Sequence, residues 1–153
     1  MSNRKIITDV YPFPISEASM KDLTDMELLF LTREKATFLA AFYKDQVVGT
    51  IAVRPYDGRI VSLGNRYNLE ETCEIIKCYV DKNLRKQGIG SSLFNEVERY
   101  CKEVGYKMMY LHTHKFLPGG LSFWQKKGFI TILDECNEQA TVHLEKGLVN
   151  NEL

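Results

Sequence analysis

The spacing of apolar residues switches along the chain between the two-residue period of a strand and the longer period of a helix. Helical spacing marks residues 19–36, 88–105 and 119–128. Apolar runs rich in β-branched and aromatic residues predict strands at 5–11, 37–43, 47–53, 73–80, 107–114, 129–133 and 140–146. We therefore expect a mixed sheet with helices packed on it, which is an α/β domain.

The run at 88–105 has the most regular helical pattern. Ile89, Leu93 and Val97 fall on one face, and charged residues occupy the opposite face. Gly105 follows as a natural stop, because glycine adopts the left-handed conformation of a helix C-cap without strain. We expect the apolar face of this helix to pack on the sheet.

Residues 54–69 interrupt the periodic pattern just before the strand at 73–80. They combine turn formers with tyrosine and arginine, which predicts a loop that holds a short strand at 60–63. This mixture suits a loop that lines a ligand site and an ordinary solvated loop equally well.

Length, composition and charge restrict the class of protein. The 153 residues suffice for a single domain over 1–153, and 44% hydrophobic with 26% charged residues is ordinary for a globular chain. The formal net charge of zero argues against a dedicated nucleic-acid-binding protein. No apolar run approaches the ~20 residues that a membrane span needs.

The cysteines and the opening residues bear on the cellular compartment. Cys73, Cys78, Cys101 and Cys136 form no CxxC pair, which is typical of reduced thiols rather than of a metal site or a disulfide framework. The opening residues, MSNRKIITDVYPFP, lack the apolar segment of a signal peptide. Together these features predict a cytoplasmic protein.

The stretch LRKQGIGS at 84–91 carries the strongest candidate chemistry. It joins a strand to a helix, where free backbone N–H groups and the helix dipole favour an anion, most often a phosphate. Gly88 and Gly90 let the backbone approach a ligand, and Arg85 and Lys86 add positive charge. The alternative is a plain tight turn among surface cations. The stretch lacks the GxxxxGK[ST] of a P-loop and the third glycine of a dinucleotide fingerprint.

The wider sequence resembles the GNAT family of N-acetyltransferases. The segment at 73–105, CEIIKCYVDKNLRKQGIGSSLFNEVERYCKEVG, is similar to the core motif of the family, in which Arg85, Gly88 and Gly90 match R/Q-x-x-G-x-G/A. The later motif at 119–129 includes LSFWQKKGF, which resembles the family's FYxxxGF. The resemblance covers roughly residues 37–146 and implies a single-domain acyl-CoA N-acyltransferase fold.

That resemblance also implies an enzyme with acetyl-CoA as cosubstrate, bound where the central strands splay apart. By that resemblance, we expect such an enzyme to acetylate a primary amine of a small molecule or protein by direct attack in a ternary complex. Dimers are frequent among such proteins. By the same analogy, the main chain of Tyr79 and Val80 pairs with the pantetheine, and Phe123 and Trp124 belong to the same site. The analogy also implies that the pyrophosphate is held by the backbone amides of Arg85, Lys86, Gln87, Gly88, Ile89, Gly90 and Ser91.

Glu74 is the candidate base for the amine. Its place fourteen residues before Gly88 matches many family members, and we expect it to take a proton or orient a water. Strand alternation puts Glu74 on one face with Ile76, Cys78 and Val80, so an apolar setting would raise its basicity. The alternative is a solvated glutamate at a strand end. The resemblance assigns the backbone N–H of Cys78 to the thioester oxyanion.

The sequence departs from the family where a general acid is expected. Phe123 and Trp124 replace the usual pair that ends in tyrosine, and an indole is no practical acid. Tyr110, His112 and His114 are the alternative donors, or the thiolate leaves without one. Two histidines on one strand do not make a metal site, so no metal is expected. The missing tyrosine keeps a second function open, a CoA-binding sensor or interaction module with weak catalysis.

Overall fold

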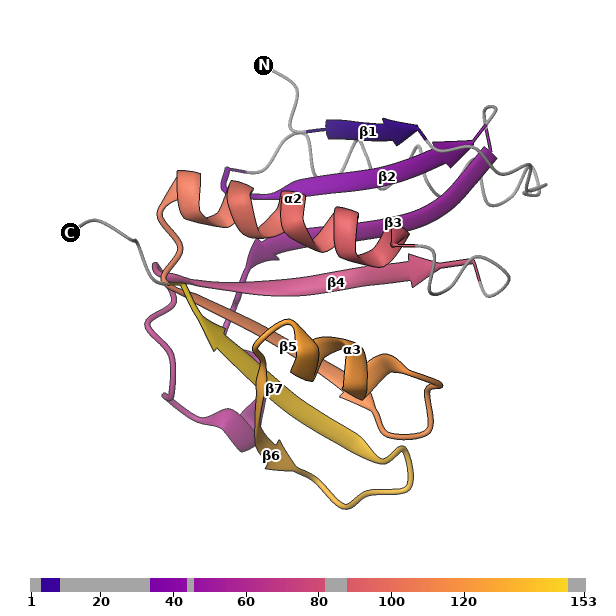
Figure 1. The fold of residues 1–153 in the computed structure, drawn as a ribbon. Coiled ribbons are helices and arrows are strands. Elements are labelled where there is room, and N and C mark those ends of the chain that lie inside the picture. Colours follow the sequence, from indigo (N-terminus) through magenta and orange to yellow (C-terminus); the bar gives the residue numbers. More distant parts are fainter. Residues whose placement is uncertain (1–3, 9–33, 44–45, 82–87, 149–153) are drawn as a thin grey trace.

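The computed structural model describes residues 4–8, 34–43, 46–81 and 88–148, which form a seven-stranded sheet with two helices (Figure 1). The strand order is β1-β2-β3-β4-β5-β7-β6, and only the β1–β2 and β4–β5 pairs are parallel within these residues. The helices are α2 (Ile89–Val104) and α3 (Gly120–Lys126). The strands are β1 (Arg4–Thr8), β2 (Thr37–Tyr43), β3 (Gln46–Pro55), β4 (Thr72–Val80), β5 (Met108–His114), β6 (Ile130–Asp134) and β7 (Thr141–Gly147).

The expected mixed sheet is confirmed, and one local prediction is wrong. Residues 61–63 form a short 3-10 helix, η1 (Val61–Leu63), instead of a strand. The N–H of Leu63 donates to the carbonyl of Ile60. Val61 is 92% exposed, and Leu63 is the buried side chain of this turn. The helix expected at 19–36 lies almost wholly outside the described residues.

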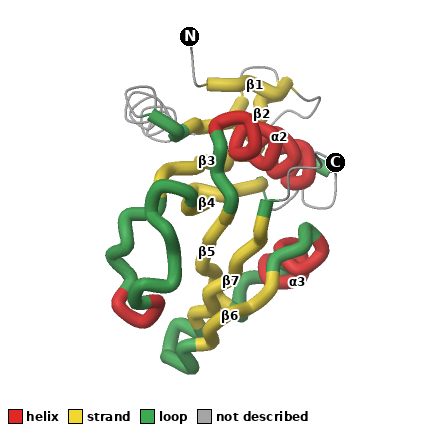
Figure 2. Tube along the Cα trace, turned by 90° about the vertical axis from the view of Figure 1, so that its left-hand side faces the viewer, coloured by secondary structure: helices red, strands yellow, loops and turns green. Residues whose placement is uncertain are grey.

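Both helices cover the same side of the sheet, and the loop between β3 and β4 lies on the other side (Figure 2). The principal core forms beneath the helices, where Leu93, Phe94 and Val97 of α2 meet β3, β4, β5 and β7. A smaller cluster on the opposite side joins Tyr56 and Leu63 of the loop to Tyr110 of β5. The loop therefore covers the middle of the sheet.

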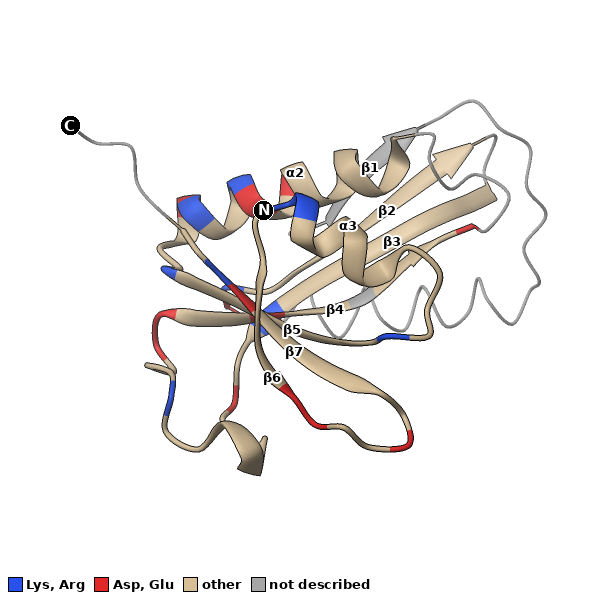
Figure 3. Cartoon of the chain, turned by 60° about the horizontal axis from the view of Figure 1, so that its bottom comes forward, with Lys and Arg blue, Asp and Glu red and all other residues tan. Residues whose placement is uncertain are grey.

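Helix α2 follows the sequence pattern closely. Its predicted apolar face is buried, and Gly105 ends it at φ 95° with backbone N–H bonds to Cys101 and Lys102. The charged residues of α2 lie in the C-terminal part of the helix, and its first turns carry none (Figure 3). None of the described helices has the length and apolar character of a membrane span.

Trp124 of α3 lies in the core, where its ring packs against Phe94 at 5.7 Å and Phe129 at 5.3 Å between centroids. Replacing Trp124 by alanine should lower the free energy of unfolding by about 3–5 kcal/mol, because the lost aromatic volume leaves a cavity. Urea unfolding with an unchanged slope measures this loss. Phe116→Ala is the matched control, since Phe116 is 65% exposed and should change stability by about 0.5 kcal/mol at most.

Candidate active site

The two central strands separate partway along their length. The parallel pairing of β4 with β5 ends at Glu74 and Tyr110. Beyond this pair, β4 continues to Val80 and β5 continues to His114, and the two strands diverge (Figure 1). Glu74 therefore marks the point of separation, and the following part of β4 has an edge with which β5 does not pair.

A bulge changes which side chains of β4 share a face. The register with β3 shifts opposite residues 76–79, where β4 has one residue more than its partner strand. Ile75 before the shift and Val80 after it both pack into the core beneath the helices. The prediction that Glu74 and Val80 share a face is therefore wrong, because the bulge reverses the alternation between them.

Helix α2 begins beside the far end of β4. Its N-cap is Gly88 at φ 86°. Because glycine has no side chain that could cap the helix, the first backbone N–H groups of α2 have no acceptor within the helix. A Cβ on Gly90 would lie 3.3 Å from the Phe123 ring and 3.5 Å from Val80. The helix start, β4 and α3 thus converge at a site suited to an anion. Arg85, Lys86 and Gln87 lie outside the described residues.

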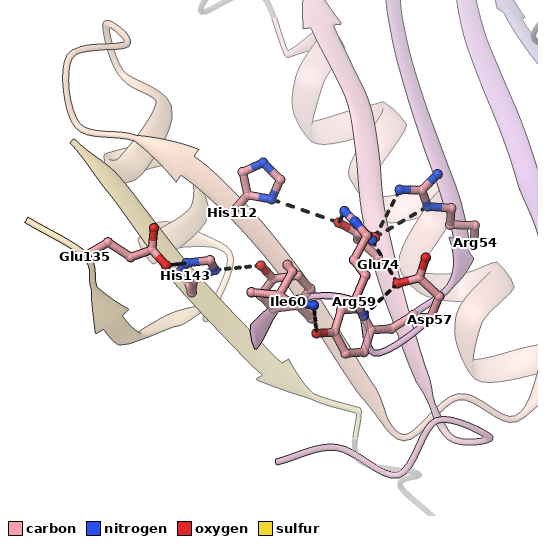
Figure 4. Close-up of polar contacts among 10 residues, drawn as sticks. Arg54, Asp57, Arg59, Ile60, Glu74, His112, Glu135 and His143 are labelled. Atoms are coloured by element: carbon pink, nitrogen blue, oxygen red, sulfur yellow. Dashed lines mark hydrogen bonds and ion pairs between the residues drawn. The ribbon is translucent and has the colours of Figure 1, made fainter. Parts of the chain in front are cut away.

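Glu74 is fully buried and is held by two arginines (Figure 4). Arg59 donates from Nη1 to Oε1 at 2.7 Å and from Nη2 to Oε2 at 2.8 Å. Arg54 adds longer contacts to Oε1 at 3.3 and 3.4 Å, and Asp57 accepts from Arg59 at 3.1 Å. The hydrogen bond with Glu74 raises the pKa of Arg59 above its usual range. This buried carboxylate is stable because its charge is paired in good geometry.

His112 lies on β5, two residues beyond the last pair with β4. Its Nδ1 is 3.9 Å from Oε2 of Glu74, which is too long for a direct hydrogen bond (Figure 4). The side chain is 40% exposed. Partial burial lowers the pKa of His112 and so favours the neutral ring, against the opposing effect of Glu74. His114 instead contacts the carbonyl of Gln139 at 2.9 Å.

Tyr110 links β5 to β7 through a buried polar contact. It is 0% exposed, and its hydroxyl lies 2.6 Å from Nδ1 of His143. Desolvation raises the pKa of Tyr110. On the far side of the imidazole, Nε2 is 3.2 Å from Glu135 but lacks the alignment of a hydrogen bond. Tyr110 is thus enclosed by protein rather than presented to the gap between the strands.

Cys78 occupies the bulge of β4. The residue has exposed surface, but its thiol is surrounded closely enough that desolvation raises the pKa to about 11. The sulfur is therefore a protonated thiol at neutral pH and a poor nucleophile. Within the described part of the chain, no three His, Cys, Asp or Glu side chains gather closely enough to hold a metal ion.

Sequence reasoning missed both arginines at Glu74. Arg54 lies directly opposite Glu74 in the β3–β4 register, so it could have been found only if the pairing of these two strands had been predicted. Arg59 approaches from the loop that follows β3, and no local pattern marks it. His143 and Glu135 were missed too. The contact of Tyr110 with His143 joins residues 33 positions apart in sequence, and Glu135 approaches His143 from the turn that follows β6.

Comparison with known proteins identifies relatives over most of the chain. The model of the acetyltransferase (GNAT) family matches residues 2–129. Human N-acetyltransferase 8 is 24% identical over 108 residues, which are 71% of this chain and 44% of that protein. The chain thus spans less than half the length of this curated relative.

Solved structures give the same fold. An acetyltransferase of the GNAT family from Staphylococcus aureus Mu50 superposes with a TM-score of 0.66 at 23% identity, covering 88% of this chain and 81% of that one. An aminoglycoside 6'-N-acetyltransferase complexed with coenzyme A superposes with a TM-score of 0.62 at 17% identity, covering 90% of this chain and 83% of that one. At these identities the likeness establishes the fold.

Proposed function

Since the chain belongs to the acetyltransferase (GNAT) family, we propose that it is an enzyme that moves an acetyl group from acetyl-CoA to a primary amine of a small molecule or protein. The observation that carries this proposal is the convergence of three elements beside the separated strands. The glycine-capped start of α2, the end of β4 and Phe123 of α3 meet there.

The residues present fit acetyl-CoA. The N–H groups from Gly88 to Ser91 suit the pyrophosphate, because they lie at the positive end of a sixteen-residue helix without a side-chain cap. At Tyr79 and Val80, β4 pairs with β3 on one edge, and β5 has already diverged from the other edge. The pantetheine amides suit that second edge in the manner of an added strand.

Acetyl-CoA supplies a thioester whose carbonyl carbon bonds to the amine nitrogen as the C–S bond breaks with its electron pair on sulfur. The backbone of Cys78 at the bulge donates to the developing oxyanion. Glu74 orients water and the neighbouring polar groups at the point of strand separation. Trp124 packs in the core and gives up no proton, so the CoA thiolate, whose parent thiol has a pKa of about 8.5, leaves without a dedicated acid.

The test of this proposal is CoA thiol release from acetyl-CoA across a panel of amines at pH 8, where more of each amine is unprotonated. The panel holds polyamines, amino acids, aminoglycosides and peptides with free N-terminal and lysine amines. Release with one class of acceptor is the expected result. Thermal melts with acetyl-CoA, ATP and NAD run in parallel, because saturation at about 100 times Kd adds roughly 2.7 kcal/mol of stability.

Two outcomes would contradict the proposal in different ways. A melting temperature raised by acetyl-CoA without thiol release from any acceptor would favour a CoA-binding module. A melting temperature raised by ATP or NAD but not by acetyl-CoA would exclude acetyl-CoA as the cosubstrate.

A further inference from the structure

We propose that His112 is the group that takes the proton from the attacking amine, and that Glu74 positions and tunes His112 instead of taking the proton itself. This inference rests on the proposed function and assigns its proton transfer. As the N–C bond forms, the nitrogen sheds one proton to the imidazole, which passes it to solvent. The CoA thiolate takes up a proton from solvent, so protons balance over the turnover.

Glu74 is poorly placed to accept a proton. Its side chain is 0% exposed, and both carboxylate oxygens already accept short hydrogen bonds from the fork of Arg59. Arg54 approaches the same Oε1 from β3. Protonation would exchange charge-assisted hydrogen bonds for weaker ones inside the protein, and an incoming amine would have to displace a guanidinium. The carboxylate therefore works as a fixed negative charge.

His112 has the properties that Glu74 lacks. It lies just past the point where β4 and β5 part, it is 40% exposed, and it approaches Glu74 without being bonded to it. The ring centroid of His112 lies 6.1 Å from that of His143 and 6.2 Å from that of His114. These contacts limit the orientation of the His112 ring. The charged and titratable groups that face it are Glu74 on β4, Arg59 from the loop, His143 on β7, His114 on its own strand and Glu135 beyond β6.

These surroundings set the working state of the imidazole. Desolvation, the other histidines and Arg59 favour the neutral ring, whereas Glu74 favours the imidazolium. The ring is therefore an available acceptor at neutral pH, and the carboxylate beside it stabilises the cation that forms during transfer.

The first test needs no acceptor and no cofactor. Histidine Cε1–H resonances of the free protein, assigned with Gln variants, should show His112 titrating below the ordinary value of about 6.5. Glu74→Gln should move that midpoint lower, because it removes the largest of the neighbouring charges that favour the imidazolium. A midpoint for His112 above about 6.5, or one that Glu74→Gln leaves in place, would overturn the inference.

The second test is the pH dependence of turnover. Expressed per unprotonated acceptor, kcat/KM of the wild type should fall about tenfold per pH unit below the pKa of His112. His112→Gln should remove this fall and reduce kcat/KM at pH 8 by roughly 10²–10⁴-fold, with acetyl-CoA affinity unchanged. His114→Gln is the comparison variant: the acidic fall should persist and move slightly toward higher pH, because the His114 ring opposes protonation of His112 but does not itself take the proton.

The outcomes separate this inference from the function on which it rests. Turnover in His112→Gln with the acidic fall intact would overturn the role of His112 and leave the acetyltransferase standing. A wild-type protein that acetylates no amine would overturn both.

Discussion

Gly88→Asp should bind acetyl-CoA roughly thirty- to a thousandfold more weakly than Gly88→Asn. The two side chains have the same shape, and both tolerate the left-handed backbone better than most residues do. Gly88 stands at φ 86° at the start of α2, and a Cβ there would meet no atom within 4 Å. The variants therefore differ by one negative charge beside the proposed pyrophosphate site, which costs about 2–4 kcal/mol at short range.

Isothermal titration with acetyl-CoA measures both affinities, and urea unfolding checks that both variants fold equally well. The Gly88→Asn variant supplies the cost of strain alone, because replacing a left-handed glycine costs about 1 kcal/mol whatever the ligand. The difference should shrink at high salt, since screening weakens the repulsion. Equal affinities for the two variants would place the phosphates away from the start of α2.

The sequence was most informative where structure depends on local pattern. Strands at 37–43 and 107–114 and the helix at 88–105 follow directly from periodicity, and the structure reproduces them within one or two residues. The same reasoning failed at 60–63, where an apolar run without a neighbouring strand folds as a 3-10 turn. It failed again in β4, because the bulge opposite β3 depends on pairing that no single strand specifies.

In the candidate site, too, features set by local sequence could be predicted and features set by long-range contacts could not. Gly88 and Gly90 could be found from the sequence, because the conformation of a helix start and its exposed N–H groups are local properties. Glu74 could be located, but not its environment. The Arg59 that fixes its charge lies fifteen residues away in an irregular loop, so the ion pair exists only in the folded chain. The sequence predicted a solitary carboxylate in apolar surroundings, and the structure shows a paired one.

Arg59→Met should lower the free energy of unfolding by about 2–4 kcal/mol. The methionine keeps much of the apolar stem, while the buried Glu74 loses its two shortest hydrogen bonds and keeps only the longer contacts of Arg54. Removing one partner of a buried ion pair is costly because the remaining charge stays desolvated. The partial exposure of Arg59, 41% of its side chain, places the effect toward the lower part of the usual range.

Urea unfolding at pH 7 measures this effect, and a double variant identifies its cause. The double variant Arg59→Met with Glu74→Gln should recover at least half of the loss, since no uncompensated charge is then buried. If the double variant is less stable than Arg59→Met, then Arg59 stabilises the fold through packing of its loop, and its ion pair with Glu74 is not the source of the loss.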